Sequence, residues 1–149
     1  MHRRELQSSA LDGRPGYAEQ FTQVLDSFGH ELSAGDCVVL GDLNASLQGP
    51  SRDAHAVNLD RASALGLVSA YHAANDVAHG NEPDMTLKWI GPGRVEYRYH
   101  CDFVFVPEAI ANRISCYVVP TFSWERSVSD HQPVLVELPT GALRAGRSS

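Results

Sequence analysis

The chain lacks the features that define several large classes of protein. None of its apolar runs approaches the roughly 20 residues that a membrane-spanning helix needs, and its first residues, MHRREL, contain no apolar core of a signal peptide. There is no internal repeat and no low-complexity tract, and the formal net charge is −6 rather than basic. This acidic balance argues against a module that binds nucleic acid mainly by neutralising phosphates. It permits an enzyme that uses divalent cations to offset its own acids and an anionic substrate.

Cysteine is also scarce. The three cysteines, Cys37, Cys101 and Cys116, are odd in number and widely spaced, and two of them lie inside apolar, strand-like runs. This pattern favours buried free thiols over disulfides or a zinc site, and a reducing cytoplasm fits it best. With 149 residues the chain is long enough for one domain with a real core.

What the sequence does contain is an alternation of helical and strand-like segments. Apolar residues recur at helical spacing between Tyr17 and Leu32 and predict an amphipathic helix there. Further helices are predicted over 53–65 and 108–114, and strands over 37–40, 86–90, 95–106, 115–119 and 134–138. Residues 1–16 read as a polar loop and 140–149 as a disordered tail, which leaves 17–139 as one α/β domain.

The first polar motif is the segment GDLN, which directly follows the apolar run Val38 to Leu40. It places Asp42 and Asn44 at the end of a buried strand. Asp and Asn are favoured turn residues because their side chains bond the local backbone, so a simple turn is one interpretation. The other is a pair of ligands for a metal ion or a phosphate.

Two further motifs carry acids near strands. Asp102 lies in the apolar, aromatic segment YHCDFVFV, where an unpaired carboxylate would cost several kcal/mol to bury. Asp130 and His131 stand in the segment SDHQP, just before the last predicted strand. Alternation along the strand places Asp102 and Val104 on one face and Phe103 on the other. The buried acid therefore needs a compensating donor, such as a protonated histidine.

Taken together, the order and strand contexts of GDLN, the strand acid and SDH resemble the endonuclease/exonuclease/phosphatase family. The segments GLVSAYHA, EPDMTLKW and YHCDFVFVPEAIANRI also look like the bacterial branch of that family, and the resemblance covers about residues 17–138. It implies a DNase I-like fold in which two similar halves form a four-layer α-β-β-α sandwich. This chain looks like the second half only, with one mixed sheet covered by helices on its outer face.

The resemblance implies a role for each motif residue. Asp42 would orient or help to deprotonate the attacking water, and Asn44 would hold a phosphate oxygen or a metal-bound ligand. Asp130 would be a metal ligand, with Asp42 and Asn44 beside it. His131 would face the scissile phosphate as general base or transition-state stabiliser, and Asp102 would bind the other ring nitrogen. The implied cofactor is Mg²⁺ or Mn²⁺, which prefers such oxygen ligands.

The implied activity is divalent-metal-dependent hydrolysis of a phosphodiester or phosphomonoester, with nucleic acid among the candidate substrates. The family's principal metal ligand is a glutamate of the first half, and Glu5, Glu19 and Glu31 do not resemble it. We therefore expect weak Mg²⁺ binding by the isolated chain, and either self-association or pairing with an N-terminal half. The alternative is a non-catalytic remnant or interaction domain that keeps the fold.

The remaining polar and aromatic residues give weaker indications. His100 is expected to point away from the site, and His55, His72 and His79 are expected on loops or helix surfaces without a role. Arg94 and Arg98 lie on the strand before Asp102, where they are either phosphate contacts or solubilising residues. Trp89 and Trp124 either flank a substrate opening or belong to the core or an interface.

Overall fold

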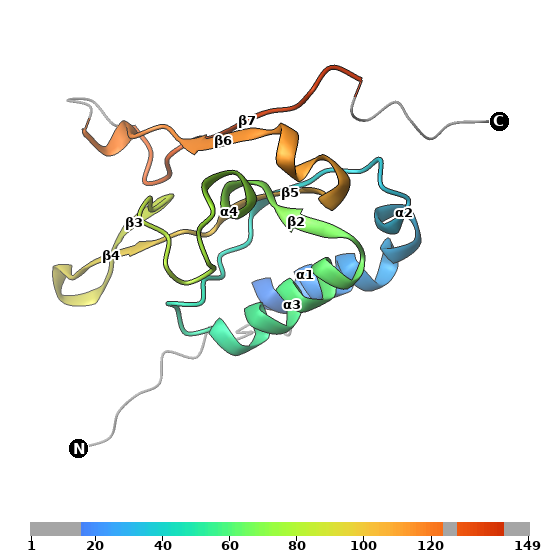
Figure 1. The fold of residues 1–149 in the computed structure, drawn as a ribbon. Helices are drawn as coiled ribbons and strands as arrows, with labels where there is room; N and C mark the ends of the chain where they lie inside the picture. The colour runs from blue at the N-terminus through green and yellow to red at the C-terminus, as the bar shows by residue number, and fades with distance from the viewer. Residues whose placement is uncertain (1–15, 124–127, 142–149) are drawn as a thin grey trace.

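The computed structural model describes residues 16–123 and 128–141 (Figure 1). In chain order the helices are α1 (Tyr17–Ser27), α2 (Gly29–Ser33), α3 (Arg52–Ala64) and α4 (Ala70–Asn75), with 3-10 turns at Pro92–Arg94, Glu108–Arg113 and Thr121–Ser123. The strands are β1 (Val39–Asp42), β2 (Leu67–Ser69), β3 (Leu87–Ile90), β4 (Glu96–Tyr99), β5 (Asp102–Pro107), β6 (Ser115–Val118) and β7 (Val134–Glu137). Most of the predicted N-terminal loop and tail, and Trp124, lie outside these residues.

The described strands form three sheets, and all four strand pairings are antiparallel. β5 lies between β1 and β2, β3 pairs with β4, and β6 pairs with β7. The α/β class is confirmed, but these sheets replace the one mixed sheet that was predicted. The reason lies at His100 and Cys101, where the predicted strand over 95–106 breaks into β4 and β5. The Cys101 N–H donates to the Thr86 hydroxyl instead of to a neighbouring strand.

One face of the β1-β5-β2 sheet is covered by α1 and α3, which run side by side in Figure 1. The core on this side contains Phe21 and Leu25 from α1, Leu32 and Ala62 from α2 and α3, and Leu67, Phe103 and Phe105 from the strands. Phe21 stacks on Phe105, with ring centroids 5.5 Å apart. The i, i+4 spacing of Phe21 and Leu25 thus seats α1 on the face of β5 that alternation assigns to its phenylalanines.

A second core lies on the other side of β5. It is formed by Ala70, Tyr71, Val106, Ile110, Cys116 and Val118, which come from α4, β5, β6 and the turn between the last two. Val134 and Val136 of β7 pack against it. The short helix α4, which the sequence did not predict, holds Tyr71 in this core.

The helix predicted from Tyr17 to Leu32 is also interrupted. α1 ends at Ser27, Phe28 leaves helical geometry, and α2 starts at Gly29. Glycine weakens helix continuation because it gains backbone freedom in the unfolded chain. Phe28, which belongs to the predicted apolar face, is 54% exposed. Among the described helices, none has the length and apolar character that crossing a membrane requires.

Candidate active site

Asp42 and Asp102 face each other across the β1–β5 ladder. Asp42 is the last residue of β1 and Asp102 the first of β5, and the two are paired in register. Side chains of directly opposed residues lie on the same face of a sheet. The edge of the ladder therefore brings together two acids that are 60 positions apart in the sequence.

His131 reaches this edge because its segment lies along β3. The Lys88 N–H donates to the Asp130 carbonyl at 2.8 Å, and the Gln132 N–H donates to the Thr86 carbonyl at 2.7 Å. Held in this way, the His131 ring lies between the two acids. Its Nδ1 is 2.8 Å from Oδ2 of Asp102, and its Nε2 is 3.9 Å from Oδ2 of Asp42. The contact between Asp102 and His131 expected from the sequence is thus present.

Asn44 completes the group through Asp42. Its backbone N–H donates to Oδ1 of Asp42 at 2.8 Å, and its side-chain Nδ2 donates to Oδ2 at 2.6 Å. Asn44 has a φ of +45°, in the left-handed region that Asn tolerates better than most residues. Asp42 therefore ends its strand in a tight turn while keeping one carboxylate oxygen directed toward His131.

The acids govern the charge of His131. Partial burial alone lowers the pKa of the His131 imidazole, but the Asp102 hydrogen bond and the charges of Asp102, Asp42 and Asp130 outweigh it and raise the pKa. The protonated, positively charged ring is therefore favoured. Cys101 lies beside this group, and burial together with the Asp102 charge raises the pKa of its thiol well above the ordinary value. Cys101 thus stays a neutral thiol next to the acids.

A cavity of about 360 Å³ opens at this edge, lined by Asp42, Asp102 and His131 together with Leu40, Val104 and Val134. One ligand atom each from Asp42, Cys101, Asp102 and His131 lies within 4.8 Å of the others. The Asp130 carboxylate is outside that close group, although its charge acts on His131. Of the five candidate residues, the structure therefore brings together Asp42, Asn44, Asp102 and His131. The fifth, Asp130, lies near them but outside the close group.

Thr86 supports the site and was not singled out from the sequence. It is fully buried, and its hydroxyl accepts the backbone N–H groups of Cys101 at 3.0 Å and Asp102 at 3.1 Å. Its own carbonyl accepts the Gln132 N–H. Thr86 thus fixes the backbone at Asp102 through its side chain and the His131 segment through its main-chain carbonyl. A lone threonine before a predicted strand carries no signal for such a role.

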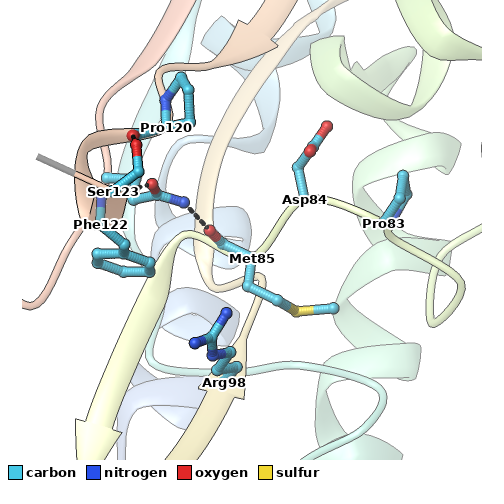
Figure 2. Close-up of a pocket in the computed structure, with 8 residues that line it drawn as sticks. Pro83, Asp84, Met85, Arg98, Pro120, Phe122 and Ser123 are labelled. Carbon is cyan, nitrogen blue, oxygen red and sulfur yellow. Dashed lines mark hydrogen bonds between the residues drawn. The ribbon is translucent and has the colours of Figure 1, made fainter.

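A second cavity, of about 370 Å³, is drawn in Figure 2 and is lined by residues that include Asp84, Met85, Arg98 and Phe122. Gln132 lines both cavities, donating to the Met85 carbonyl at 2.6 Å and accepting from the Phe122 N–H at 3.1 Å. Arg98 also lines the second cavity, and its Nε donates to Glu96 at 2.6 Å. Trp89 stacks on Tyr97 of the β3–β4 hairpin and is 43% exposed.

The remaining histidines are only in part where the sequence placed them. His55, His72 and His100 are buried and His79 is half-buried. Their rings pack around Phe103, which alternation places on the face of β5 opposite to Asp102. The expectation that His100 points away from the site is therefore met, and His79 lies on a loop as expected, but His55 and His72 are buried rather than on helix surfaces.

No protein-family model matches the sequence, and a search of curated proteins found no significant relative. Among solved structures, the fold is similar to the endonuclease domain of TRAS1, a telomere-specific non-LTR retrotransposon, with a TM-score of 0.56 and 17% sequence identity. The match covers 86% of this chain and 54% of that domain, so the chain spans about half the length of the structure it matches. The fold is thus of the DNase I-like endonuclease type.

Proposed function

We propose that this chain carries part of the active site of a phosphoesterase of the endonuclease/exonuclease/phosphatase type, with nucleic acid as its substrate. The observation that carries the proposal is the line Asp102–His131–Asp42. The ring is bonded to one acid at 2.8 Å, and its free edge faces the other at 3.9 Å, at the mouth of a cavity. That gap is too long for a direct hydrogen bond and leaves room for a water molecule or a phosphate oxygen.

Each residue then has a chemical task. Asp102 orients the His131 ring and stabilises its cationic form, while Nε2 of His131 is directed at the substrate. The imidazolium would offset charge that develops on the phosphoryl oxygens. Asp42 would position the attacking water and accept its proton, and the Asn44 amide would hold Asp42 in place or bind a phosphate oxygen. Water attack at phosphorus breaks the P–O bond, and the leaving oxygen takes a proton from the solvent or His131.

The donors present fit a weakly held Mg²⁺ or Mn²⁺. Asp42, Asn44 and Asp130 offer the hard oxygen atoms that such ions prefer, and they would hold the ion between them. When bound, it would supply positive charge at the phosphate. The neutral Cys101 thiol is a poor ligand for a hard ion. With two carboxylates and one amide among the described residues, we propose that the complete centre takes a further ligand from outside them.

Nucleic acid is favoured over a small phosphate ester by the neighbouring cavity. Gln132 lines both cavities, and Arg98, whose Nε also donates to Glu96, lines the second one and would be the cation that meets a second phosphate. A substrate with one phosphate would not need this second cavity. The solved domain of similar fold is named an endonuclease, which agrees with this choice.

One observation favours a second candidate, a non-catalytic domain that keeps the fold. Both oxygens of Asp42 already accept hydrogen bonds from Asn44, as they would in a turn without any catalytic duty. In that case the GDLN segment would be local structure only.

Nuclease assays separate the two candidates. The purified chain is incubated with supercoiled plasmid, single-stranded RNA and an aryl phosphodiester, each with Mg²⁺, Mn²⁺ or EDTA. Because the proposed centre is incomplete among the described residues, we expect slow cleavage that requires a high concentration of the metal and falls by about 10²–10⁴-fold in His131→Ala, the range typical of a lost acid–base group. Asp42→Asn should fall comparably.

The matched control is His30→Ala, which removes an exposed histidine of α2 and should cleave like the wild type. Cleavage that persists in His131→Ala would come from another source and would refute the proposed site. No cleavage of any substrate with either metal would favour the non-catalytic domain.

A further inference from the structure

A second group of ionisable side chains lies outside the candidate active site. Nε2 of His72 is 2.9 Å from Oε1 of Glu82, and both side chains are buried. Glu82 and His79 come from the loop after α4, which carries His72. One ligand atom each from His72, His79 and Glu82 lies within 4.8 Å of the others. This histidine–glutamate cluster is independent of the site proposed above.

Buried polar atoms without a protein partner gather in this cluster and in His55 and His100 beside it. Within the described part of the chain, the buried side-chain nitrogen and oxygen atoms that lack a hydrogen bond are both ring nitrogens of His55, Nδ1 of His79, Oε2 of Glu82 and Nε2 of His100. Glu82 is 5% exposed, and His55 and His100 are each 1% exposed. Buried polar groups without partners are costly and rare, so their concentration in one place calls for a ligand.

The protonation states suit a metal ion. Burial lowers the pKa of His55 and of His79 to about 4, so both rings are neutral near pH 7. Burial alone raises the pKa of Glu82, but the hydrogen bonds from His72 and the Gly80 N–H bring it to about 2, and the group is an anion. Neutral imidazole and ionised carboxylate are the forms that ligate metals.

The surroundings also resemble those of ligating histidines. Nδ1 of His72 is 2.7 Å from the Ser69 hydroxyl, which leaves Nε2 on the side of Glu82. His100 is 2.8 Å from the Asp84 carbonyl through Nδ1, which must therefore carry the proton, so its Nε2 presents a lone pair. Metal-bound histidines are commonly fixed by such a contact at the other ring nitrogen.

We propose that His72, His79 and Glu82 bind a Zn²⁺ ion, or an ion of the same preference for nitrogen ligands. Tetrahedral ligands at the usual zinc distances of about 2.0–2.2 Å lie about 3.3 Å apart, within the spread of this cluster. The ion would replace the proton shared by His72 and Glu82, and it would join the loop over 76–86 to α4. Imidazole ligands favour Zn²⁺ over Mg²⁺, so this site would not compete with the oxygen donors around Asp42.

The His79 ring must change its orientation before it can bind the ion. The His72 and His79 rings stack with centroids 3.6 Å apart and an interplanar angle of 21°, whereas a bound ion lies in the plane of each ligating ring. His79 stands on a loop, is half-buried and has no partner at Nδ1, so its ring can turn toward the ion.

Metal retention and a spectroscopic probe test the proposal. The full chain is stripped with EDTA, loaded with Zn²⁺ and dialysed, and its zinc content is measured by elemental analysis. We expect one Zn²⁺ per chain, and a melting temperature that is roughly 10 °C higher than that of the stripped protein at saturating zinc. Co²⁺ in place of zinc should give the intense visible bands of a tetrahedral site.

The variants assign the site. His79→Asn and Glu82→Gln should weaken zinc binding at least tenfold and remove the tetrahedral Co²⁺ spectrum, and His79→Asn decides alone if Glu82→Gln fails to fold. Asp130→Asn, at the candidate active site, and His30→Gln, on the surface, should retain the ion. A chain that retains no zinc, or one that loses it in Asp130→Asn but not in His79→Asn, would overturn the proposal.

Discussion

His131 lies between two carboxylates that belong to neighbouring strands, and its two ring nitrogens have different surroundings. The nitrogen on the Asp102 side is held at hydrogen-bonding distance, and the one on the Asp42 side faces the cavity. The sequence places the Asp102 carboxylate in an apolar segment, where burying it is costly. A neighbouring histidine whose cationic form is favoured offsets this cost. The charge of one side chain thus depends on the position of another 29 residues away.

This dependence can be measured directly. In metal-free protein, Asp102→Asn should lower the pKa of His131, because it removes the hydrogen-bonding carboxylate whose charge opposes the effect of burial. The ring C–H signals in an NMR titration report the change. Asp130→Asn is the matched control and should lower the pKa less, since Asp130 acts only through its more distant charge. An unchanged His131 titration in Asp102→Asn would show that the pair does not control the ring.

At the scale of elements, the site depends on the junction between β3, β4 and β5. Thr86 accepts two backbone N–H groups at the start of β5 and holds the His131 segment through its carbonyl. No neighbouring strand supplies these bonds, so a single hydroxyl replaces part of a ladder. The position of Asp102 relative to His131 is therefore set by this residue.

Thr86→Val keeps the shape of the side chain and removes its hydroxyl. It should cost about 1–3 kcal/mol of unfolding free energy, because two buried N–H groups lose their acceptor. Urea unfolding measures the loss. Thr22→Val, at a hydroxyl that contacts Ala18 and Asn58 between α1 and α3, is the matched control. Only Thr86→Val should also shift the His131 NMR signals, and equal shifts in both variants would contradict the role of Thr86.

Sequence patterns predicted the parts that depend on local chemistry. The apolar run before Asp42 located β1, and the alternation around Asp102 located β5 and placed Asp102 on the face opposite to Phe103, whereas the pairing of Asp42 with Asp102 is known only from the structure. The break at His100 and Cys101 could not be predicted, because it depends on a hydroxyl from a distant segment. The same holds for the cluster at Glu82, since a histidine in a polar loop becomes buried only through tertiary packing around Phe103. The roles of the motif residues remain predictions.

For the whole molecule, the buried histidines make stability depend on pH. The folded-state pKa values of His55 and His79 are about 4, below the unfolded value near 6.5. Between these values the unfolded chain binds more protons, so stability present above pH 6.5 is lost as the pH falls through 4. His131, with its raised pKa, acts in the opposite sense and in another pH range: its stabilisation is fully present below pH 6.5 and is lost as the pH rises through its folded pKa. The lowered pKa of Glu82 adds a further loss of stability as the pH falls from about 4.5 to about 2.

We therefore expect the metal-free protein to lose stability steadily between pH 6.5 and 4, well before its surface carboxylates are protonated. Urea unfolding in EDTA at a series of pH values measures this slope. In His55→Leu the slope should be reduced by close to one proton, because only one of the depressed groups is removed. A free energy of unfolding that stays constant from pH 7 to 5 would mean that these rings are accessible to water and protons.

The face of the β1–β5 ladder opposite to α1 and α3 is only partly covered. Val106 is buried there by the second core, whereas Leu40 is 72% exposed on β1, at the edge of the ladder. Exposed apolar residues on an edge strand favour pairing with another chain.

We expect the isolated chain to self-associate through β1. Leu40→Lys should shift it toward the monomer in sedimentation velocity, with β-structure unchanged. Val57→Lys, at a 56% exposed valine of the helix α3, is the matched control and should leave association as in the wild type. A wild-type chain that sediments as a monomer at high micromolar concentration would show that the cover already present on this face is sufficient.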